Sequence, residues 1–358
     1  MRIAFDVSPL SHPPLGIGNY MQGSLKGLVA AAAGKHEIVA FAPTSIRGPD
    51  RIRGALVGID VELRTWRLPF SHALRTGWSM AAHPAAERLI GRFDALHFSD
   101  WMYPPQHGGV RATTIHDLVP LHHPEWTTSR TRSMHGRKYR NAAETCDVVF
   151  VNSEFTGRDV VETLGVAAER VRVARPAAKD VFTPEGAAED LGAAYILTVA
   201  TLEPRKNLQT LVEAHRLLAG DILLAVVGAE GWGEQPLLDD PRIRRLGYVS
   251  DEELARLYRG ADAAVYPSRF EGFGIPVIEA MACGVPVVVS SHESLDEASG
   301  HAAVRADPDD PVAIAAAIDR ALGERSLLVP AGLEHSRSFS WRAVGEVFLR
   351  GYEEAALR

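Results

Sequence analysis

The sequence is poor in cysteine, and no stretch of it is apolar over a long distance. Its two cysteines, Cys146 and Cys283, lie far apart, so neither a disulfide framework nor a cysteine-based zinc site is expected. No apolar run reaches the roughly 18 residues that a membrane-spanning helix needs. The first ten residues, MRIAFDVSPL, lack the long apolar region of a signal peptide. We therefore expect a cytoplasmic protein that does not cross a bilayer.

Aromatic residues are also few, at 7%, whereas apolar residues make up 46% and charged residues 23% of the 358 positions. This composition is typical of a soluble globular protein and argues against a fibre or a disordered chain. The length fits two domains of about 150 to 200 residues each. Residues 1–176 contain 21 Lys and Arg against 16 Asp and Glu, and the remainder contains 17 against 29. Two parts of opposite net charge favour two domains.

Short β-branched runs alternate with longer alanine- and leucine-rich segments, a pattern typical of parallel α/β units. In the first part we predict strands at 2–7, 36–42, 61–66, 94–98, 111–115, 147–151 and 170–175, and helices near 18–33, 80–91, 129–144 and 154–164. In the second part we predict strands at 195–200, 222–228, 243–247, 263–267, 285–290 and 302–306, and helices near 207–219, 251–260, 276–283 and 311–323.

These elements predict an α/β protein with two doubly wound, Rossmann-like domains, residues 1–176 and 195–338. Residues 177–194 show no periodicity and collect Pro, Gly and Ala, so we expect a linker. The final stretch, 339–358, contains an amphipathic segment that predicts a helix packing on either domain, with a return to the first as one option. Because ligands of such sheets bind at the carboxyl ends of the strands, we expect the domains to face each other across a ligand-binding crevice.

The loop after the first predicted strand contains GIGNY, with Gly16 and Gly18 just before a helix. Free backbone N–H groups at a helix N-terminus hold phosphate groups, so these glycines are candidates for phosphate binding. The other interpretation is a tight turn that enters the helix. Met21 stands where a dinucleotide-binding fingerprint needs Gly or Ala, which argues against a dehydrogenase.

His116 and Asp117 directly follow the predicted strand 111–115. A histidine at that end of a strand is placed to contact a ligand, and the adjacent carboxylate could fix its ring or raise its pKa. Alternatively, the histidine caps the next element. His122 and His123 match no metal-ligand spacing, so we expect no metal site.

The segment VATLEPRKNL, residues 199–208, places Arg205 and Lys206 at the start of a predicted helix. Two cations at a helix N-terminus oppose the helix dipole, which favours an anion bound between them. A diphosphate fits this arrangement because both side chains form charge-assisted hydrogen bonds. The alternative is a pair of solvated surface charges.

The segment RFEGFGIPVIEAMACGVP, residues 269–286, places Glu271 and Glu279 around a glycine-rich turn. A buried carboxylate is costly unless a donor meets it. An ionised carboxylate accepts hydrogen bonds from two adjacent hydroxyl groups, so we expect a sugar at Glu271 and a ribose at Glu279. The backbone N–H groups from Gly272 to Ile275 would be available to the same ligand. The alternative is that both carboxylates cap the helix.

The segment RTRSMHGRKYR, residues 130–140, contains six basic side chains. The simplest interpretation is a solvated helix face, and the alternatives are contact with an anionic acceptor or with anionic lipid headgroups. The segment is short and interrupted by Gly136, so nucleic-acid binding is not expected.

Taken together, these motifs resemble the retaining glycosyltransferases of family 4, which have the GT-B fold of two Rossmann-like domains. The resemblance covers nearly the whole chain. It rests most on EGFGIPVIE, which matches the family's motif of two glutamates separated by seven residues, and on the following AMACGVPVVVS. Further matches are GIGNY, IHDLVP, VNSEFTGRDV, ILTVATLEPRKNL, RLGYVSDEELARLY and FSW. The sequence departs from the family at SSHESLDEASG, so no role is assigned to Glu297.

The resemblance implies transfer of a sugar from a nucleotide diphosphate sugar to an acceptor hydroxyl, with retention at the anomeric carbon. The leaving phosphate would take the acceptor's proton on the same face, so neither an obligatory protein base nor a metal or other cofactor is expected. The resemblance implies that Glu279 binds the ribose and that Val249 packs against the base. It implies that Glu271 and the backbone of Gly272, Phe273, Gly274 and Ile275 bind the transferred sugar, with His116 nearby. Arg205 and Lys206 would neutralise the diphosphate, aided by Gly16 and Gly18.

Family habit makes GDP-mannose the first choice of donor, with UDP- and dTDP-sugars as rivals. The acceptor is a saccharide, a lipid-linked molecule or a small molecule, and nucleic acid is not a partner. A lipid-linked acceptor would place the protein at the inner membrane face, through residues 130–140. Two alternative functions share the fold: a nucleotide-sugar epimerase and a non-catalytic nucleotide-sugar-binding module. Activity that depends on an acceptor distinguishes the transferase from both.

Overall fold

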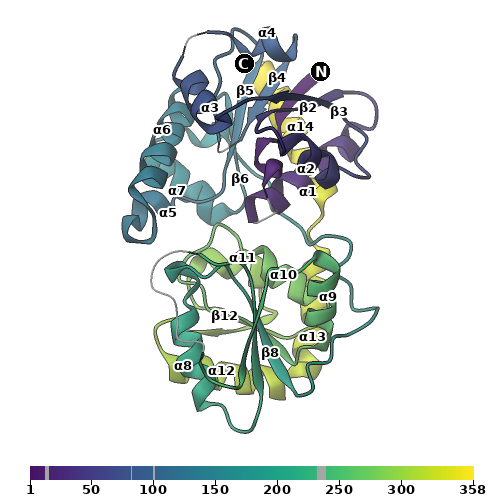
Figure 1. Ribbon diagram of the computed structural model, residues 1–358, viewed down its shortest axis with the longest axis vertical. Coiled ribbons are helices and arrows are strands. Elements are labelled where there is room, and N and C mark those ends of the chain that lie inside the picture. Colours follow the sequence, from purple (N-terminus) through teal and green to yellow (C-terminus); the bar gives the residue numbers. More distant parts are fainter. Residues whose placement is uncertain (13–15, 82, 100, 232–238) are drawn as a thin grey trace. The chain divides into compact units, whose positions relative to one another are not determined.

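The computed structural model describes residues 1–12, 16–81, 83–99, 101–231 and 239–358 (Figure 1). The chain divides into two compact units, of which the first comprises Met1–Pro176 and Ser340–Arg358, and the second comprises Ala177–Phe339. Each unit is built around one parallel β-sheet. The predicted α/β class with two doubly wound sheets is therefore confirmed.

The first unit contains a seven-stranded sheet in the order β3-β2-β1-β4-β5-β6-β7. Its strands are β1 (Arg2–Asp6), β2 (Glu37–Thr44), β3 (Glu62–Arg67), β4 (Ala95–Phe98), β5 (Val110–Ile115), β6 (Val148–Val151) and β7 (Val171–Val173). Its longer helices are α1 (Gly16–Ala32), α2 (Gly48–Ala55), α3 (Ser71–Met80), α6 (Ser129–Thr145), α7 (Glu154–Leu164) and α14 (Trp341–Ala356). Short helical segments are η1 (Ser8–Ser11), α4 (Ala86–Ile90), α5 (Val119–His122), η2 (Pro124–Trp126) and η3 (Ala168–Arg170). The strand order reverses between β1 and β4, and ligands of doubly wound sheets bind beside such a reversal.

The second unit contains a six-stranded sheet in the order β10-β9-β8-β11-β12-β13. Its strands are β8 (Tyr195–Val199), β9 (Leu223–Val227), β10 (Ile243–Gly247), β11 (Ala263–Tyr266), β12 (Val287–Ser290) and β13 (Ala303–Ala306). Its helices are α8 (Leu208–Leu217), α9 (Asp251–Gly260), α10 (Ile275–Ala282), α11 (Asp296–Ser299), α12 (Pro311–Gly323) and α13 (Arg325–Arg337), with 3-10 turns η4 (Pro204–Lys206) and η5 (Glu293–Leu295). Here the order reverses between β8 and β11.

The central strands carry no polar alternation because helices cover both faces of each sheet. All six residues of β5 and all five residues of β9 are buried. Two apolar clusters fill the second unit, and they contain alternate residues of the same strands, such as Leu197 and Ile196 of β8. Burial on both faces thus explains the β-branched runs from which the strands were predicted.

The last helix, α14, belongs to the first unit and packs along α1, as Figure 1 shows. A Cβ atom at Gly27 would overlap the carbonyl oxygen of Trp341, and one at Gly345 would overlap the carbonyl oxygen of Gly27. Only glycine lets the two backbones approach this closely. The amphipathic pattern predicted the helix but left its domain open, and the glycines decide it.

Residues 177–194 form neither a helix nor a strand in this fully described segment, but they are packed onto the second unit. Phe182 is buried in the core of that unit, and the N–H of Glu189 donates to the carbonyl oxygen of Arg256 at 2.9 Å. The boundary between the two units falls at Pro176, so most of the expected linker is a fixed part of the second unit.

The predicted helix at 80–91 is wrong. The structure has α3 and α4 in its place, and Pro84 lies between them, where its ring and missing N–H prevent a continuous helix. The longer helices α2 and α13 and the short helices α5 and α11 were not predicted, and the prediction reached α3 only at its last residue. The segment of α13 contains Pro330 and has little amphipathic pattern, so periodicity gave no signal. Among the described residues no helix combines the length and the apolar character that a bilayer span requires.

Candidate active site

The second unit gathers charged side chains at the reversal of its strand order. The loop after β8 carries Glu203, Arg205 and Lys206, and the loop after β11 carries Glu271. Because β8 and β11 are neighbours in the sheet, these two loops emerge side by side at the same edge. The two predicted segments, 199–208 and 269–286, therefore meet in the folded unit.

Arg205 and Lys206 both form ion pairs with Glu271. The Nη1 atom of Arg205 lies 2.7 Å from Oε2 of Glu271, and the Nζ atom of Lys206 lies 2.7 Å from Oε1. Glu203 provides a second carboxylate, 2.6 Å from Nη2 of Arg205. Lys206 also donates to the hydroxyl group of Tyr266 at 2.7 Å. The result is a largely buried cluster of two cations and two carboxylates.

The two cations decide the protonation state of Glu271. Burial alone would raise the pKa of this carboxyl group, but Arg205 and Lys206 outweigh burial and lower the pKa to about 2. Burial also lowers the pKa of Lys206, against the attraction of Glu271. Since two cations share this carboxylate, Glu271 is ionised at every pH near neutrality.

The turn that carries the two cations differs in one respect from the prediction. Arg205 and Lys206 do not open the helix, because they lie in the 3-10 turn η4, and α8 begins after Asn207. Asn207 has a positive φ of 57° and its side-chain amide donates to the carbonyl oxygens of Pro267 and Pro308, at 3.2 and 2.6 Å. This buried asparagine ties the cation turn to the loop that carries Glu271.

The glycine-rich turn after Glu271 is fixed at its end by Gly274. This residue has a φ of +105°, and a Cβ atom on it would lie 2.6 Å from Cδ2 of Leu295. Both the conformation and the close approach therefore require glycine. Ile275 and Pro276 form the first turn of α10, while Gly272 and Phe273 are buried in the turn itself.

The backbone of this turn presents hydrogen-bond donors beside the charged cluster. In the described part of the chain, the N–H groups of Phe273 and Gly274 have no backbone acceptor. The N–H of Glu271 is used internally, because it donates to Oγ of Ser294 at 3.0 Å. The turn can thus offer N–H donors to a polar ligand next to the Arg205 and Lys206 side chains.

Glu279 lies one turn further along α10 in a different environment. It is only 4% exposed, and none of the described residues donates a hydrogen bond to its carboxyl group. Burial raises its pKa to about 8, opposed by the positive charge of Lys179 and supported by the negative charge of Asp251. The expectation of an ionised Glu279 therefore needs correction, because desolvation keeps this carboxyl group protonated at neutral pH in the unliganded protein.

Val249 lies between β10 and the start of α9 and packs, partly buried, against the same apolar core as α10. The next residue, Ser250, caps α9 through a capping box with Glu253. Lys179 holds this end of the helix through its 2.6 Å contact with Asp251. Val249 is thus on a well-fixed turn of the unit that also contains Glu279.

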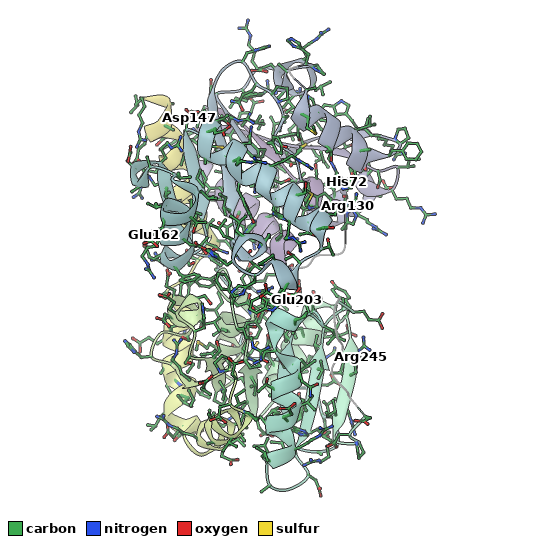
Figure 2. All side chains as sticks on the ribbon, turned by 90° about the vertical axis from the view of Figure 1, so that its left-hand side faces the viewer. His72, Arg130, Asp147, Glu162, Glu203 and Arg245 are labelled. Carbon is green, nitrogen blue, oxygen red and sulfur yellow. The ribbon has the colours of Figure 1, made fainter. Side chains whose placement is uncertain are left out.

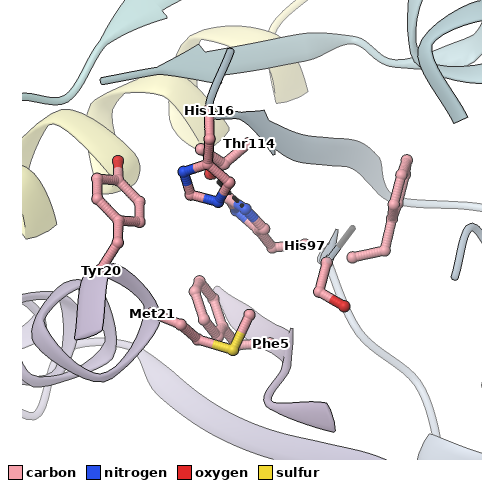
Figure 3. A pocket seen from close by; sticks show the side chains of 8 residues that line it. Phe5, Tyr20, Met21, His97, Thr114 and His116 are labelled. Atoms are coloured by element: carbon pink, nitrogen blue, oxygen red, sulfur yellow. Dashed lines mark hydrogen bonds between the residues drawn. The ribbon is translucent and has the colours of Figure 1, made fainter. Parts of the chain in front are cut away.

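In the first unit, His116 follows the end of β5 and lines a small pocket (Figure 3). The pocket has a volume of about 10 Å³, room for about one water molecule. It is lined by Phe5, Tyr20, Met21, His97, Phe98, Ser99, Thr114 and His116. The ring of Tyr20 meets the ring of His116 edge-on at 4.9 Å, and the Tyr20 hydroxyl donates to the carbonyl oxygen of Ala174 at 3.0 Å.

Asp117 contacts the element that follows it. Its Oδ1 accepts the N–H of Val119, the first residue of the short helix α5, at 3.1 Å. His122 contacts Asp159 at 2.7 Å, and His123 contacts Glu125 at 3.1 Å and stacks on Trp126. Over the described ranges no group of three or more His, Cys, Asp or Glu side chains could hold a metal ion.

Gly16 and Gly18 form the first turn of α1. Gly16 is exposed and has open space where a Cβ atom would lie, whereas Gly18 is buried. Residues 13–15, in the same predicted loop, lie outside the described residues. The structure therefore places both glycines at a helix N-terminus, where the sequence predicted them.

The basic segment 130–140 forms part of α6, and two of its cations serve the fold. The Nζ atom of Lys138, a completely buried residue, donates to the carbonyl oxygen of Thr114 at 2.8 Å. Arg132 donates to the carbonyl oxygens of Pro124 and Thr127, each at 2.7 Å. The segment is therefore less uniformly solvated than its composition suggests.

Sequence reasoning missed Glu203, Tyr266 and Tyr20. Glu203 lies within the segment 199–208, and its signal was a carboxylate two residues before an Arg-Lys pair at the end of a strand. Tyr266 and Tyr20 sit among apolar residues of a strand and a helix, where a tyrosine is ordinarily a core residue. Only the fold shows that their rings and hydroxyl groups contact Lys206 and His116.

The sequence and the fold of this chain are similar to those of known glycosyltransferases. The profile described as "Glycosyl transferases group 1" matches residues 183–331, and the profile described as "Glycosyltransferase Family 4" matches residues 16–178. O-antigen chain mannosyltransferase B of Escherichia coli is 30% identical over 95% of this chain and 96% of its own length.

Among solved structures, sucrose-phosphate synthase from Thermosynechococcus elongatus superposes with a TM-score of 0.74, at 21% identity over 99% of this chain and 98% of that chain. The Anabaena protein HepE, solved in complex with UDP-glucose, superposes with a TM-score of 0.71, at 16% identity over 99% and 100%. At these identities the two superpositions compare the fold.

Proposed function

Because this chain belongs to the glycosyltransferases of family 4, we propose that it transfers a sugar with retention from a nucleotide diphosphate sugar to a hydroxyl group of a saccharide acceptor. The chain has the GT-B fold and is a glycosyltransferase. The observation that carries the proposal of a diphosphate donor is the cluster of Arg205 and Lys206 with Glu203 and Glu271 at the strand reversal of the second unit.

The chemical need of such a reaction is the stabilisation of charge on the departing diphosphate. As the bond between the anomeric carbon and the phosphate oxygen breaks, positive charge develops on the sugar and negative charge on the diphosphate. Preorganised cations in a site of low dielectric constant stabilise this charge more than water does. The Arg205 and Lys206 side chains are largely buried and are held by Glu203 and Glu271. In the described part of the chain, the nearby N–H groups of Phe273 and Gly274 have no backbone acceptor.

In the proposed donor complex, the diphosphate competes with Glu271 for the same donors. The Glu271 carboxylate then accepts hydrogen bonds from two neighbouring hydroxyl groups of the sugar, for which an ionised group with both oxygens available is required. The low pKa of Glu271 ensures that the carboxylate is ionised. We assign Glu271 a positioning role and the two cations the role of stabilising the leaving group.

Glu279 is proposed to bind the ribose of the donor in its protonated or its ionised form. A protonated carboxyl group donates one hydrogen bond and accepts others, so it pairs with a ribose diol as well as an ionised one does. The absence of a donor to Glu279 among the described residues leaves its hydrogen-bonding capacity for a ligand. Val249, on the neighbouring turn, is proposed to pack against the base.

His116 and the pocket beside it are proposed to lie near the transferred sugar and the attacking hydroxyl group. The pocket combines aromatic and thioether side chains with the hydroxyl groups of Thr114 and Ser99, and its volume of about 10 Å³ suits a single hydroxyl group or water molecule. We propose no protein base, because the leaving phosphate can take the acceptor's proton. The charge-assisted hydrogen bonds that Arg205 and Lys206 can offer to the diphosphate support a reaction without a metal ion.

The names of two similar proteins indicate candidates for the donor. The Escherichia coli relative is named a mannosyltransferase, which supports mannose and hence GDP-mannose as the first candidate. HepE was solved with UDP-glucose, which makes a UDP-sugar the main rival. The two candidates differ in the base, so free nucleotides suffice to separate them.

We would measure thermal unfolding with GDP, UDP, ADP and dTDP, each in EDTA and in magnesium. A nucleotide at 100 times its dissociation constant adds about 2.7 kcal/mol to the free energy of unfolding. A shift of the midpoint by one nucleotide in EDTA would identify the base and support a metal-free site. If none of the four nucleotides shifts the midpoint, the proposed donor site is wrong. A shift that needs magnesium would overturn metal independence alone.

A further inference from the structure

The first unit has its own strand reversal, and the residues beside it are fixed by Asp6. This buried carboxylate ends β1 and accepts hydrogen bonds from the N–H and the hydroxyl of Ser8, at 2.8 and 2.6 Å. Its second oxygen accepts the N–H of Ser99 at 3.2 Å and also the Ser99 hydroxyl, from the end of the neighbouring strand β4. Four donors therefore occupy Asp6 and fix the loops that follow β1 and β4.

Arg75, on α3, is buried near this reversal, but its hydrogen-bond donors are only partly paired. It is 4% exposed, and its guanidinium carbon lies 4.7 Å from the centre of the Trp101 ring. Its Nη1 atom donates to the carbonyl oxygen of Pro43 at 3.2 Å. Its Nε atom is buried and donates to no acceptor among the described residues. A guanidinium group has five N–H donors, and leaving them unpaired in a buried place is costly.

Arg111 of the same unit is a buried arginine whose Nε, Nη1 and Nη2 atoms all donate hydrogen bonds. Its Nε donates to Thr145, its Nη1 to Pro104 and Gln106, and its Nη2 to Asn141, with distances from 2.7 to 3.1 Å. The fold can therefore supply a full set of acceptors to an internal guanidinium. Compared with Arg111, the Nε–H of Arg75 lacks an acceptor among the described residues. We therefore infer that an acceptor from outside the described residues can bind there.

The surroundings of Arg75 add positive charge. The ring of His12 meets the ring of Trp101 edge-on, with 4.7 Å between the ring centres. Arg51 lies nearby and donates to the carbonyl oxygen of Ser11 at 3.3 Å. Desolvation and then the charges of Arg75 and Arg51 lower the pKa of His12. Desolvation, Arg130 and Arg75 similarly lower the pKa of His72 (Figure 2 labels His72 and Arg130). Among the described residues Asp6 attracts Arg75, but Ser8 and Ser99 donate to both of its oxygens, and it accepts no hydrogen bond from the guanidinium group.

We propose that Arg75, Trp101 and His12 form a subsite for an anionic group, a phosphate or a carboxylate, carried by the acceptor. The inference rests on the proposed function, and it specifies the acceptor. A phosphate or carboxylate matches the guanidinium fork with two parallel hydrogen bonds, while the Trp101 ring covers the face of the guanidinium. A cation would be repelled by Arg75, and a neutral sugar hydroxyl would not match the guanidinium fork with two parallel hydrogen bonds.

The subsite connects directly to the pocket at His116. Ser99 lines that pocket, holds Asp6 through its hydroxyl group, and accepts the N–H of Trp101 at 3.3 Å. Ser99, which forms part of the wall of the His116 pocket, is therefore hydrogen-bonded to Trp101, whose ring covers Arg75. An acceptor whose anion lies on Arg75 would be oriented with its other end toward the His116 pocket, where the reacting hydroxyl is proposed to lie.

The first test is isothermal titration of the full-length chain with three matched probes in EDTA, without nucleotide. The probes are glucose, glucose 6-phosphate and glucuronate, which share a ring and differ in charge. We expect at least one charged probe to bind at least about tenfold more tightly than glucose. The tighter of the two charged probes identifies phosphate or carboxylate. Equal affinity for all three probes, or no binding of either charged probe at millimolar concentration, would overturn the proposal.

The second test compares Arg75→Gln with Arg53→Gln, which removes an exposed arginine that pairs with Asp50 in the same unit. Arg75→Gln is expected to weaken binding of the preferred charged probe about tenfold or more, and Arg53→Gln to leave it unchanged. If Arg75→Gln does not fold, the exposed Arg51→Gln provides the test, with a severalfold loss that is largest at low salt. Unchanged binding in the folded variant that is tested would overturn the subsite.

A third comparison separates this inference from the proposed function. Lys206→Gln is expected to weaken nucleotide binding and to leave the charged probe unaffected, because Lys206 belongs to the second unit. Nucleotide binding without charge-selective probe binding would reject the subsite alone. Charge-selective probe binding without any nucleotide binding would reject the proposed donor site and retain the subsite.

Discussion

The Nζ atom of Lys206 lies 2.7 Å from Oε1 of Glu271, and the two side chains are 11% and 8% exposed. Arg205 occupies the other oxygen of the same carboxylate at 2.7 Å. The two residues predicted to bind the diphosphate are therefore held by the residue predicted to bind the sugar. These ion pairs hold the Arg205 and Lys206 side chains in place before the donor binds.

Glu271→Gln should destabilise the protein. The substitution leaves Arg205 and Lys206 as buried cations without this shared carboxylate, and breaking a buried ion pair by removing one partner costs about 3 to 5 kcal/mol. Because Glu203 still pairs with Arg205, we expect the lower end of this range. Urea unfolding at pH 7 measures the difference. A loss below about 1 kcal/mol would contradict a dominant role of this ion pair.

The pH dependence of that difference has a fixed sign. The pKa of Glu271 is lowered from 4.5 to about 2 in the folded protein, so the unfolded chain takes up protons first as the pH falls. The stabilisation is fully present above pH 4.5 and is lost as the pH falls toward 2. Wild type and Glu271→Gln should therefore converge in stability between pH 4.5 and the acid limit of folding.

Lys206→Met should mainly lower turnover. Methionine keeps the length of the side chain but removes the charge that faces the departing diphosphate. Loss of one preorganised donor of this kind costs about 100-fold to 1,000-fold in kcat. Steady-state kinetics with the donor identified by nucleotide binding measures this effect, with the exposed Lys35→Met as the control. If both variants turn over equally fast, Lys206 has no role in leaving-group stabilisation.

Glu279→Gln should make the protein more stable at alkaline pH. Burial raises the pKa of Glu279 from 4.5 to about 8, so the folded protein keeps a proton that the unfolded chain releases. The stability of the wild type consequently falls as the pH rises from 4.5 to 8, by up to about 1.4 kcal/mol per unit for this group. Glutamine has no such dependence, because its side chain does not ionise.

Urea unfolding of wild type and Glu279→Gln at pH 5, 6, 7 and 8 checks this prediction. The stability of the variant relative to the wild type should rise steadily across the series. A constant difference would mean that Glu279 titrates normally. The same variant should bind the donor nucleotide more weakly, since a glutamine oxygen and amide match the ribose diol less well than a carboxyl group does.

Gly27→Ala should destabilise the first unit by about 2 to 3 kcal/mol, because the new Cβ atom would overlap the backbone of Trp341 in α14. Gly54→Ala is the matched control, since Gly54 lies in α2 with open space around it. Removing a helical glycine there should stabilise by about 0.4 to 1 kcal/mol. Thermal unfolding of both variants provides the comparison. Equal effects would contradict the close packing of α1 and α14.

The sequence predicted the central strands well because they are buried on both faces. Runs such as residues 222–228 and 285–290 are apolar and β-branched, and β9 and β12 lie within them. Helices were predicted where one face is apolar, as in α9, and missed where proline or a weak pattern hides the helix, as in α13. The helix expected at 80–91 failed because Pro84 interrupts it.

The sequence predicted which residues belong to the site but not which of them contact each other. Arg205, Lys206, Glu271 and Glu279 stood out because charges interrupt apolar or glycine-rich segments at strand ends. Their pairing did not, since the distance between residues 206 and 271 along the chain carries no geometric information. Glu203 and Tyr266 were overlooked for the same reason.

By itself, the sequence determined the fold class, the positions of the strands along the chain and the family, because these follow from local periodicity and from motifs of fixed spacing. Tertiary structure decided which domain receives α14, where contact between backbones selects glycine at Gly27 and Gly345. It also decided that Glu271 is ionised and that Glu279 is protonated. The two glutamates are chemically identical and eight residues apart, and only the cations beside one and the apolar surroundings of the other set their charges apart.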